Sequence, residues 1–204
     1  MTSTSEPDPD TEWTMLVRPV AFMRCSQRLH HEAPRQARLG GADDEVRGFV
    51  VVRHGLQNLL QDLAGFSHVW LLFACHLTRG YRDQVQPPRD VRKRGLFATR
   101  TPNRPNPIGL SAVRLLRIER RVLHVGAHDL LDGTPVLDIK PYVPAYDAIP
   151  DARAGWVEGI PPGRPDHRAW WRERGVAPPR VYERLVRTEE GGGRTDAPPT
   201  GNGS

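Results

Sequence analysis

The stretch Gly95–Ser111 constrains this chain most, because three prolines lie between residues 102 and 107. Each proline fixes its own φ and biases the preceding residue toward extended backbone, so the loop is stiff. Short apolar runs predict a strand at Leu96–Thr99 before the loop and another from Leu110 after it. A stiff loop can hold polar side chains in fixed directions, here Arg100, Asn103, Arg104 and Asn106. The alternative is an ordinary rigid turn in a proline-rich chain.

A second stretch, Asp129–Tyr142, has the same order of turn, strand and polar exit. The pair Asp132-Gly133 is typical of a tight turn. In the strand that follows, Val136, Asp138 and Lys140 alternate with Leu137 and Ile139. Because neighbouring strand residues point to opposite faces, Asp138 and Lys140 are expected to share one face.

The rest of the pattern predicts many short strands. They are expected at 13–22, with Met15 and Val17 pointing inward, at 46–53, at 68–76, and as a hairpin of 110–118 and 122–127. Leucines 56, 59, 60 and 63 are spaced as on one face of a short helix that ends at Gly65. Few helices and no strand–helix alternation predict an all-β barrel or sandwich.

The expected organisation is one domain with appended segments. Residues 1–12 and 189–204 have the composition of disordered tails, 13–160 form the barrel domain, and 161–188 form a small helical appendage. Cys25 and Cys75 have neither disulfide nor metal-site spacing, which favours a reducing cytoplasm and no metal. The acidic N-terminus does not resemble a signal peptide, and no apolar run has the length of a membrane span.

The charge of the chain favours a polyanionic partner. The formal net charge is +5, and most of the 29 basic residues are arginines, a bias that genome composition can also produce. A cluster of cations leads into the proline-rich loop and could follow an RNA phosphate backbone. The candidate RNA-binding residues are Arg89, Arg92, Lys93, Arg94, Asn103 and Arg104. The alternative is that these residues form a solvated surface.

Four motifs together resemble a known family. ATRTPNRPNPIGLS, LDGTPVLDIKPY, the segment APRQ at residues 33–36 and the segment 65–76 are similar to the TsaA-like family of TrmO-type tRNA methyltransferases. The resemblance covers about residues 17–159. It implies a small β-barrel, a homodimer with its site near the interface, and S-adenosylmethionine as methyl donor. It also implies methylation of N6 of N6-threonylcarbamoyladenosine, next to the anticodon of tRNA.

The resemblance also implies where the donor binds. The cofactor-binding candidates are Pro34, Arg35, Gln36, Cys75, His76, Arg100, Leu110, Leu131, Asp132, Gly133 and Thr134. Cys75 departs from the aromatic residue expected at its position. Arg100 suits the donor carboxylate, and Asp132 suits its amine or ribose hydroxyls. No G-x-G-x-x-G motif follows the first strand, so the donor is expected in loops at a barrel mouth or a subunit interface.

Three residues are candidates for the chemistry. The carbamoyl group acidifies the proton on the acceptor nitrogen, so a nearby base would assist methyl transfer. Asp138, Lys140 and Tyr142 are the candidates, although Asp138 could equally be a structural partner of Lys140 or Arg100.

Two other functions remain open from the sequence. The first is a methyltransferase of the same fold that acts on a small metabolite. The second is a non-catalytic RNA-binding barrel, for which aromatic side chains among the cations would be needed. With Phe97 assigned to a strand, only Tyr81 lies near the cationic segment.

Overall fold

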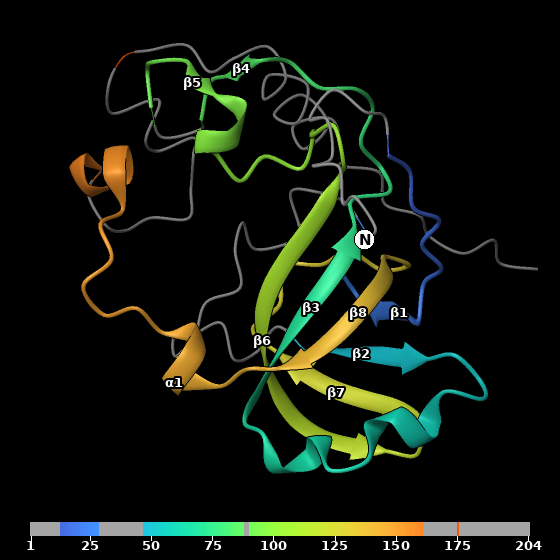
Figure 1. Cartoon of the computed structure of the whole chain (residues 1–204). Coiled ribbons are helices and arrows are strands. Elements are labelled where there is room, and N and C mark those ends of the chain that lie inside the picture. The colour runs from blue at the N-terminus through green and yellow to red at the C-terminus, as the bar shows by residue number, and fades with distance from the viewer. Residues whose placement is uncertain (1–12, 29–46, 88–89, 161–174, 176–204) are drawn as a thin grey trace, which may run out of the picture.

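The chain folds into a closed barrel of six strands. The computed structural model describes residues 13–28, 47–87, 90–160 and 175 (Figure 1). The strand order around the barrel is β1-β2-β7-β6-β3-β8, and every neighbouring pair is antiparallel. The strands are β1 (Ala21–Cys25), β2 (Arg47–Val52), β3 (His68–Ala74), β6 (Ile108–Glu119), β7 (Val122–Gly126) and β8 (Pro135–Pro141). The all-β barrel prediction is confirmed.

Alternating apolar residues of these strands fill the barrel. Val69 and Leu71 of β3 point inward and are fully buried, whereas Trp70 and Leu72, which alternate with them, point outward and are half-buried. Each fully buried Val or Leu side chain contributes roughly 1.5–3 kcal/mol of transfer free energy. The core is completed by inward residues from the other strands, among them Met23, Val50, Val113, Leu123, Val125 and Val136.

The predicted hairpin of β6 and β7 is confirmed, and its turn contains Arg120 at φ 55°. β6 is long enough to pair with β3 through its first half and with β7 through its second half. Gly109 is required at the start of β6, because a Cβ there would lie 2.3 Å from the ring of Phe73. The Phe73 ring therefore lies directly over Gly109, beside the proline-rich loop.

The strand expected at 13–22 is wrong for most of its length. Residues 13–20 form no strand, and Met15 and Val17 are 65% and 42% exposed rather than inward. Pro19 has no N–H to donate to a strand partner. The first strand therefore begins after it, at Ala21, where pairing with Val136 of β8 becomes possible.

The helix expected from the leucine spacing is also wrong. The segment forms two short 3₁₀ helices, η2 (Gln57–Leu60) and η3 (Leu63–Gly65). Asp62 adopts the left-handed conformation at φ 64° and prevents a continuous helix. Leu60 is buried, but Leu59 is 75% exposed because the 3₁₀ period does not place it on the same face.

The segment Leu96–Thr99 is not a strand. A small hairpin of β4 (Gln84–Val85) and β5 (Arg94–Gly95) leads into the 3₁₀ helix η4 (Leu96–Ala98). Leu96 is buried, and its N–H donates to the carbonyl oxygen of Asp83 at 2.8 Å. The following strand, β6, begins at Ile108, slightly earlier than expected.

A β-bulge changes the alternation expected in β8. Leu72 pairs with Asp138 and Phe73 with Val136, so Leu137 is the extra residue between them. Val136 therefore points into the core, on the face opposite to Asp138, which corrects the simple alternation. The predicted common face of Asp138 and Lys140 is confirmed, since their side chains form an ion pair of 2.7 Å.

After β8 the chain forms α1 (Pro144–Asp147) and η5 (Gly155–Gly159), which in Figure 1 lie to the side of the barrel. The expected tails, 1–12 and 189–204, and the appendage 161–188 lie outside the described residues, apart from residue 175. Within the described part of the chain, no helix has the length and hydropathy needed to cross a membrane.

Candidate functional site

Several of the predicted donor residues, Cys75, His76 and residues 131–134, lie at one end of the barrel. The end of β3, the start of β6 and the connection from β7 to β8 meet there, beneath β5 and η4 (Figure 1). The hydroxyl of Ser111 on β6 donates to Asp129 Oδ1 at 2.6 Å. The N–H of Cys75 donates to the carbonyl oxygen of Pro107 at 2.7 Å, which joins the end of β3 to the proline-rich loop.

The turn at Asp132-Gly133 is tied to the end of β1. The N–H of Asp132 donates to the carbonyl oxygen of Gln27 at 2.7 Å, and that of Gly133 to the carbonyl oxygen of Met23 at 2.8 Å. Asp132 Oδ1 accepts a hydrogen bond of 3.1 Å from the N–H of Cys25. Gly133 has φ 76°, a conformation that favours glycine. The turn predicted from the sequence is confirmed, and its carboxylate has a structural bond that the sequence did not reveal.

The remaining polar capacity of this turn suits a ligand with ammonium or hydroxyl donors. Among the described residues, the one partner of Asp132 Oδ2 is Arg24 Nη1, at a distance of 3.9 Å. Gln27 Oε1 is buried and has no hydrogen-bond partner among the described residues. Gln27 is not among the residues predicted from the sequence, because its position two residues after β1 gives no signal by itself. Leu131 and Thr134 are 7% and 4% exposed, so a ligand would reach mainly their backbone.

Cys75 remains a thiol in this environment. Burial raises the pKa of the Cys75 thiol, the nearby carboxylate of Asp129 raises it further, and Arg104 opposes both effects. A protonated thiol is a poor nucleophile. Cys75 is therefore suited to apolar contact with a ligand rather than to a covalent methyl relay.

The other predicted donor residues differ in accessibility. Arg100 is exposed and forms no hydrogen bond or ion pair with another described residue, so its guanidinium is free to bind an anion. Leu110 is 54% exposed on the outer face of β6, and His76 is exposed just beyond β3. Pro34, Arg35 and Gln36 lie outside the described residues.

Two of the three catalytic candidates lie together on the outer face of β8. Asp138 Oδ2 pairs with Lys140 Nζ, and Asp138 Oδ1 accepts from the N–H of Ile139 at 2.9 Å. In the strand register Leu110, Leu72 and Asp138 form one row across β6, β3 and β8. Neighbouring strands are about 4.8 Å apart, so Asp138 lies roughly 10 Å from Leu110.

Tyr142 follows Lys140 by two residues, just beyond the end of β8. Its ring centroid is 5.4 Å from that of Trp70 and 6.2 Å from that of His68, at the start of β3. Its N–H donates to the carbonyl oxygen of His68 at 3.1 Å. The structure therefore pairs Asp138 with Lys140, while the ring of Tyr142 packs against Trp70, the strand partner of Lys140.

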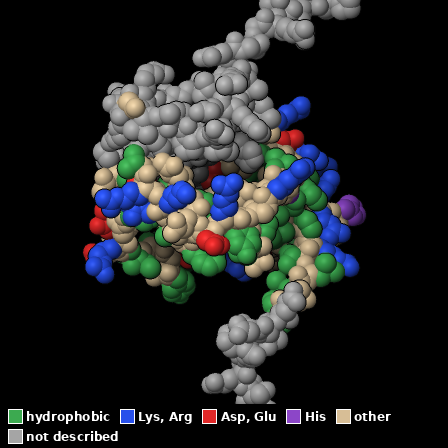
Figure 2. Space-filling view, turned by 90° about the horizontal axis from the view of Figure 1, so that it is seen from above, with side chains coloured by type: hydrophobic (Ala, Val, Ile, Leu, Met, Phe, Trp, Pro, Cys, Tyr) green, Lys and Arg blue, Asp and Glu red, His purple; other side chains and the backbone are tan. Residues whose placement is uncertain are grey.

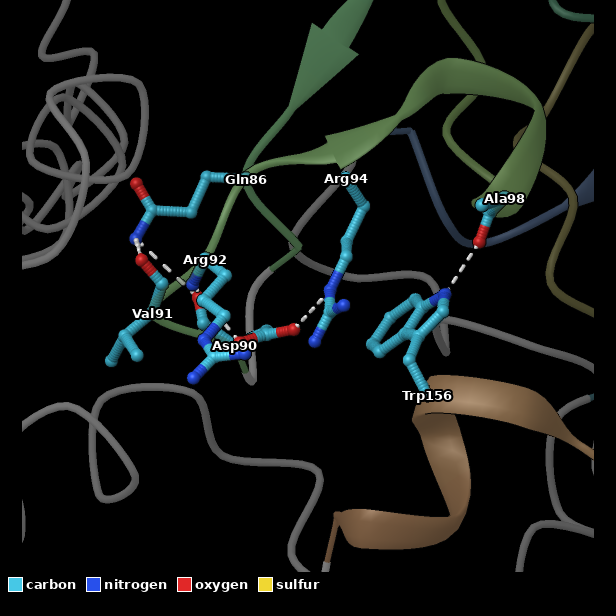
Figure 3. A network of polar contacts seen from close by, with 7 residues as sticks. All are labelled: Gln86, Asp90, Val91, Arg92, Arg94, Ala98 and Trp156. Atoms are coloured by element: carbon cyan, nitrogen blue, oxygen red, sulfur yellow. Dashed lines mark hydrogen bonds and ion pairs between the residues drawn. The ribbon is translucent and has the colours of Figure 1, made fainter.

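The cationic segment is organised by Asp90 (Figure 3). Asp90 Oδ2 accepts from Arg94 Nε at 2.7 Å, and Oδ1 accepts from the N–H of Arg92 at 3.0 Å. Burial alone would raise the pKa of Asp90, but these bonds and the two positive charges outweigh it and lower the pKa. The guanidinium of Arg94 also lies 5.1 Å from the ring centroid of Trp156.

The predicted RNA-binding residues therefore differ in what they already contact. Arg94 is paired, whereas Arg92 and Lys93 have exposed side chains. Asn103 Nδ2 donates to the carbonyl oxygens of Arg79 and Gly80, at 3.3 and 3.2 Å. Arg89 lies outside the described residues.

Arg104 braces the proline-rich loop from within. Its Nη1 donates to the carbonyl oxygen of Thr99 at 2.9 Å, and its guanidinium lies 5.4 Å from the ring centroid of Phe97. Figure 2 looks onto this end of the molecule, where Lys and Arg side chains form a row with hydrophobic side chains beside it. The exposed arrangement is suited to a polyanion that also offers apolar surface.

Other parts of the described chain show no second candidate site with predicted residues. No group of three or more His, Cys, Asp or Glu side chains in these ranges could hold a metal ion. A surface hollow at the β6–β7 hairpin is lined by Phe49, Glu119, Arg120, Arg121, Val122 and His124. None of the predicted site residues lines this hollow.

Comparison with known proteins identifies the family. Residues 22–148 match the family described as the tRNA-methyltransferase O N-terminal domain. A tRNA (adenine(37)-N6)-methyltransferase of Escherichia coli K12 is 37% identical over 151 residues, which are 70% of this chain and 63% of that protein. A probable S-adenosyl-L-methionine-binding protein of Pyrococcus abyssi is 39% identical over 141 residues, 69% of this chain and 75% of that protein.

A solved structure agrees with the sequence relatives. The crystal structure of TrmO from Pseudomonas aeruginosa matches with a TM-score of 0.59 at 40% identity, covering 71% of this chain and 63% of that one. The chain thus spans less than two thirds of the Escherichia coli and Pseudomonas aeruginosa relatives. The matched residues contain the whole six-stranded barrel except the first residue of β1. The chain therefore belongs to the tRNA-methyltransferase O N-terminal domain family.

Proposed function

We propose that the protein transfers a methyl group from S-adenosylmethionine to N6 of N6-threonylcarbamoyladenosine, next to the anticodon of tRNA. One observation carries this proposal. The ends of β1, β3 and the β7–β8 connection converge at one end of the barrel, beneath an exposed cationic surface. Family membership and the names of the relatives support the same activity.

The residues at this end fit the polar groups of the donor. Arg100 binds the carboxylate through charge-assisted hydrogen bonds. Asp132 Oδ2 and the orphaned Gln27 Oε1 accept hydrogen bonds from the ammonium group or the ribose hydroxyls. The half-buried Cys75 and the exposed Leu110 supply apolar contact for the adenine. Pro34, Arg35, Gln36 and His76 remain proposed donor contacts from the family motif.

When bound, the donor supplies a methyl group on a sulfonium centre whose sulfur becomes neutral as the methyl leaves. No new anion has to be stabilised, so positioning of the two reactants supplies much of the acceleration. The barrel is suited to this task, because the turn at Asp132 is fixed by backbone bonds to Met23 and Gln27.

We further propose Asp138 as the acceptor of the proton on the carbamoylated nitrogen. The ammonium of Lys140 orients its carboxylate, and the row that joins Asp138 to Leu110 puts both on the outer face of the barrel. Tyr142 is the alternative candidate. Its packing against Trp70 makes a role in holding β8 the simpler interpretation.

The surroundings of the site suit RNA and a second copy of the chain. Arg89, Arg92 and Lys93 are proposed phosphate contacts, with Arg94, Asn103 and Arg104 shaping the loop beside them. Ile108 and Leu110 on β6 are 49% and 54% exposed, which supports a homodimer interface on this face. The proposed location is the cytoplasm, where tRNA is found and where two unpaired cysteines stay reduced.

Calorimetry tests the donor half of this proposal. We expect both S-adenosylmethionine and S-adenosylhomocysteine to bind, and we expect no dependence on added metal. A folded protein that binds neither compound would exclude a methyltransferase and leave an RNA-binding barrel as the better interpretation.

A further inference from the structure

Phe97 has an exposed aromatic ring beside the donor end of the barrel. Its side chain is 79% exposed, whereas the preceding residue, Leu96, is buried. Phe97 lies on η4, only three residues before Arg100. A strand is expected here from the sequence, but the structure places Phe97 on this 3₁₀ helix. Its true position makes the ring accessible.

The turn that carries Phe97 is held from several sides. Both the N–H and the hydroxyl of Thr99 donate to the carbonyl oxygen of Leu96, at 3.1 and 2.8 Å. Arg104 Nη1 donates to the carbonyl oxygen of Thr99, and Trp156 Nε1 to that of Ala98. In Figure 3, the indole of Trp156 on η5 points toward Ala98 of η4. The exposed ring is therefore presented on a braced turn rather than on a floppy loop.

The charges around the ring indicate what would cover it. The guanidinium of Arg104 lies 5.4 Å from the ring centroid, and Arg92, Lys93 and Arg100 are exposed nearby in the sequence. An uncharged apolar partner would leave these cations without a counter-charge. An unpaired nucleotide offers a flat base for the ring and a phosphate for the cations. Proteins that bind single-stranded nucleic acids combine aromatic side chains with cations in this way.

We propose that Phe97 is a stacking platform for an unpaired base of the RNA substrate, positioned beside the donor site. This inference rests on the proposed function, because it assigns a contact to the tRNA that the enzyme would methylate. The base is one of the unpaired nucleotides of the anticodon loop, since bases within a duplex have no free face. Phe97 is then a substrate-positioning residue, and Arg104 supports it from one side.

The test uses the full chain and a fluorescently labelled anticodon stem–loop RNA. Stacking on an aromatic side chain is worth enough that Phe97→Ala is expected to raise the Kd by roughly 5- to 150-fold. Phe97→Leu should lose most of the affinity, and Phe97→Trp should keep it. A 2-aminopurine placed in the loop should be quenched by the wild type and by Phe97→Trp, but not by Phe97→Leu.

A matched control comes from Tyr146, which is 84% exposed on α1. Tyr146→Ala removes an exposed aromatic ring away from the cationic surface and should leave the Kd unchanged. Neither substitution should alter the melting temperature or S-adenosylmethionine binding, because both rings lie largely in water.

Three results would overturn the inference. They are equal stem–loop affinity in the wild type and Phe97→Ala, no affinity of the wild type for the stem–loop, and a change of oligomeric state in Phe97→Ala by sedimentation. The last result would assign the ring to contact between copies of the chain. Loss of stem–loop affinity in Phe97→Ala without any methyl transfer by the wild type would instead contradict only the proposed activity.

Discussion

The indole Nε1 of Trp156 donates a hydrogen bond of 2.8 Å to the carbonyl oxygen of Ala98, although the residues are 58 positions apart. The same ring lies under the guanidinium of Arg94, which is itself paired with Asp90. Trp156, on η5, thus contacts both β5 and η4 in the region above the barrel. We therefore expect the geometry of that region to depend on Trp156.

Trp156→Phe tests this dependence by removing the hydrogen bond and keeping an aromatic ring. The bond is exposed, so we expect a loss of less than about 1 kcal/mol in the free energy of unfolding. Amide exchange at residues 96–100 should become faster, and the KM for tRNA should rise while donor affinity changes little. Trp13→Phe is the control, since Trp13 is 76% exposed. Unchanged exchange at 96–100 would contradict the bracing role.

Asp132 is expected to affect stability and donor binding together. Asp132→Ala leaves the N–H of Cys25 without its acceptor and should cost about 1–3 kcal/mol. Asp132→Asn keeps the acceptor oxygen and should fold normally, yet it loses the negative charge proposed to meet the donor. Calorimetry on Asp132→Asn and Arg100→Ala should give weaker S-adenosylmethionine binding. Native affinity in both variants would locate the donor elsewhere.

Several parts of the fold could be predicted from the sequence, because local chemistry determines them. The turn at Gly133 needs a positive φ, and the apolar residues of β3 and β6 fit buried strands. Other parts depend on long-range pairing. The bulge at Leu137 arises from the register of β8 against β3, and no local sequence pattern in β8 predicts it. The exposure of Phe97 likewise depends on Leu96 being the residue that enters the core.

The candidate site was predictable in its motifs but not in its partners. The sequence placed Asp132 at a turn, but the bond to Cys25 joins residues 107 positions apart and only the fold reveals it. Arg94 and Arg104 looked like free cations, whereas one pairs with Asp90 and the other braces Thr99. Gln27 had no signal, because a buried orphan oxygen is a property of packing.

His128 should make stability depend on pH. It is fully buried, and neither ring nitrogen forms a well-aligned hydrogen bond within the described residues. Burial lowers the pKa of His128 below its usual 6.5, and the backbone of Arg47 and Leu130 offsets only part of this effect. As the pH falls below about 6.5, His128 is protonated in the unfolded chain but stays neutral in the folded chain. The free energy of unfolding therefore decreases as the pH falls through this range.

Urea unfolding between pH 8 and pH 5 measures this effect. His128→Gln should lose that part of the pH dependence, even if it lowers stability at every pH. His54→Gln, at an exposed position, should keep the wild-type dependence. An identical slope in His128→Gln and the wild type would show that His128 does not titrate in this way.

The exposed cations predict a salt-dependent interaction with RNA. Arg92→Gln with Lys93→Gln should lower the slope of log K against log salt by about 0.7–0.9 for each phosphate that is no longer neutralised. The KM for tRNA should rise, and donor affinity should not change. Arg117→Gln with Arg120→Gln removes two exposed cations near the β6–β7 turn and should leave the slope intact. If the Arg92→Gln, Lys93→Gln variant has the same salt slope as the control variant, Arg92 and Lys93 are ordinary solvated surface residues that do not contact RNA.

The most direct measurement is methyl transfer to defined tRNA. The protein is incubated with S-adenosylmethionine labelled in the methyl group and with tRNA that either carries or lacks the threonylcarbamoyl group. We predict that label enters only the modified tRNA, at N6 of the threonylcarbamoyl-bearing adenosine. Label in neither tRNA, from a protein that binds the donor, would contradict tRNA methylation and favour a small-metabolite acceptor.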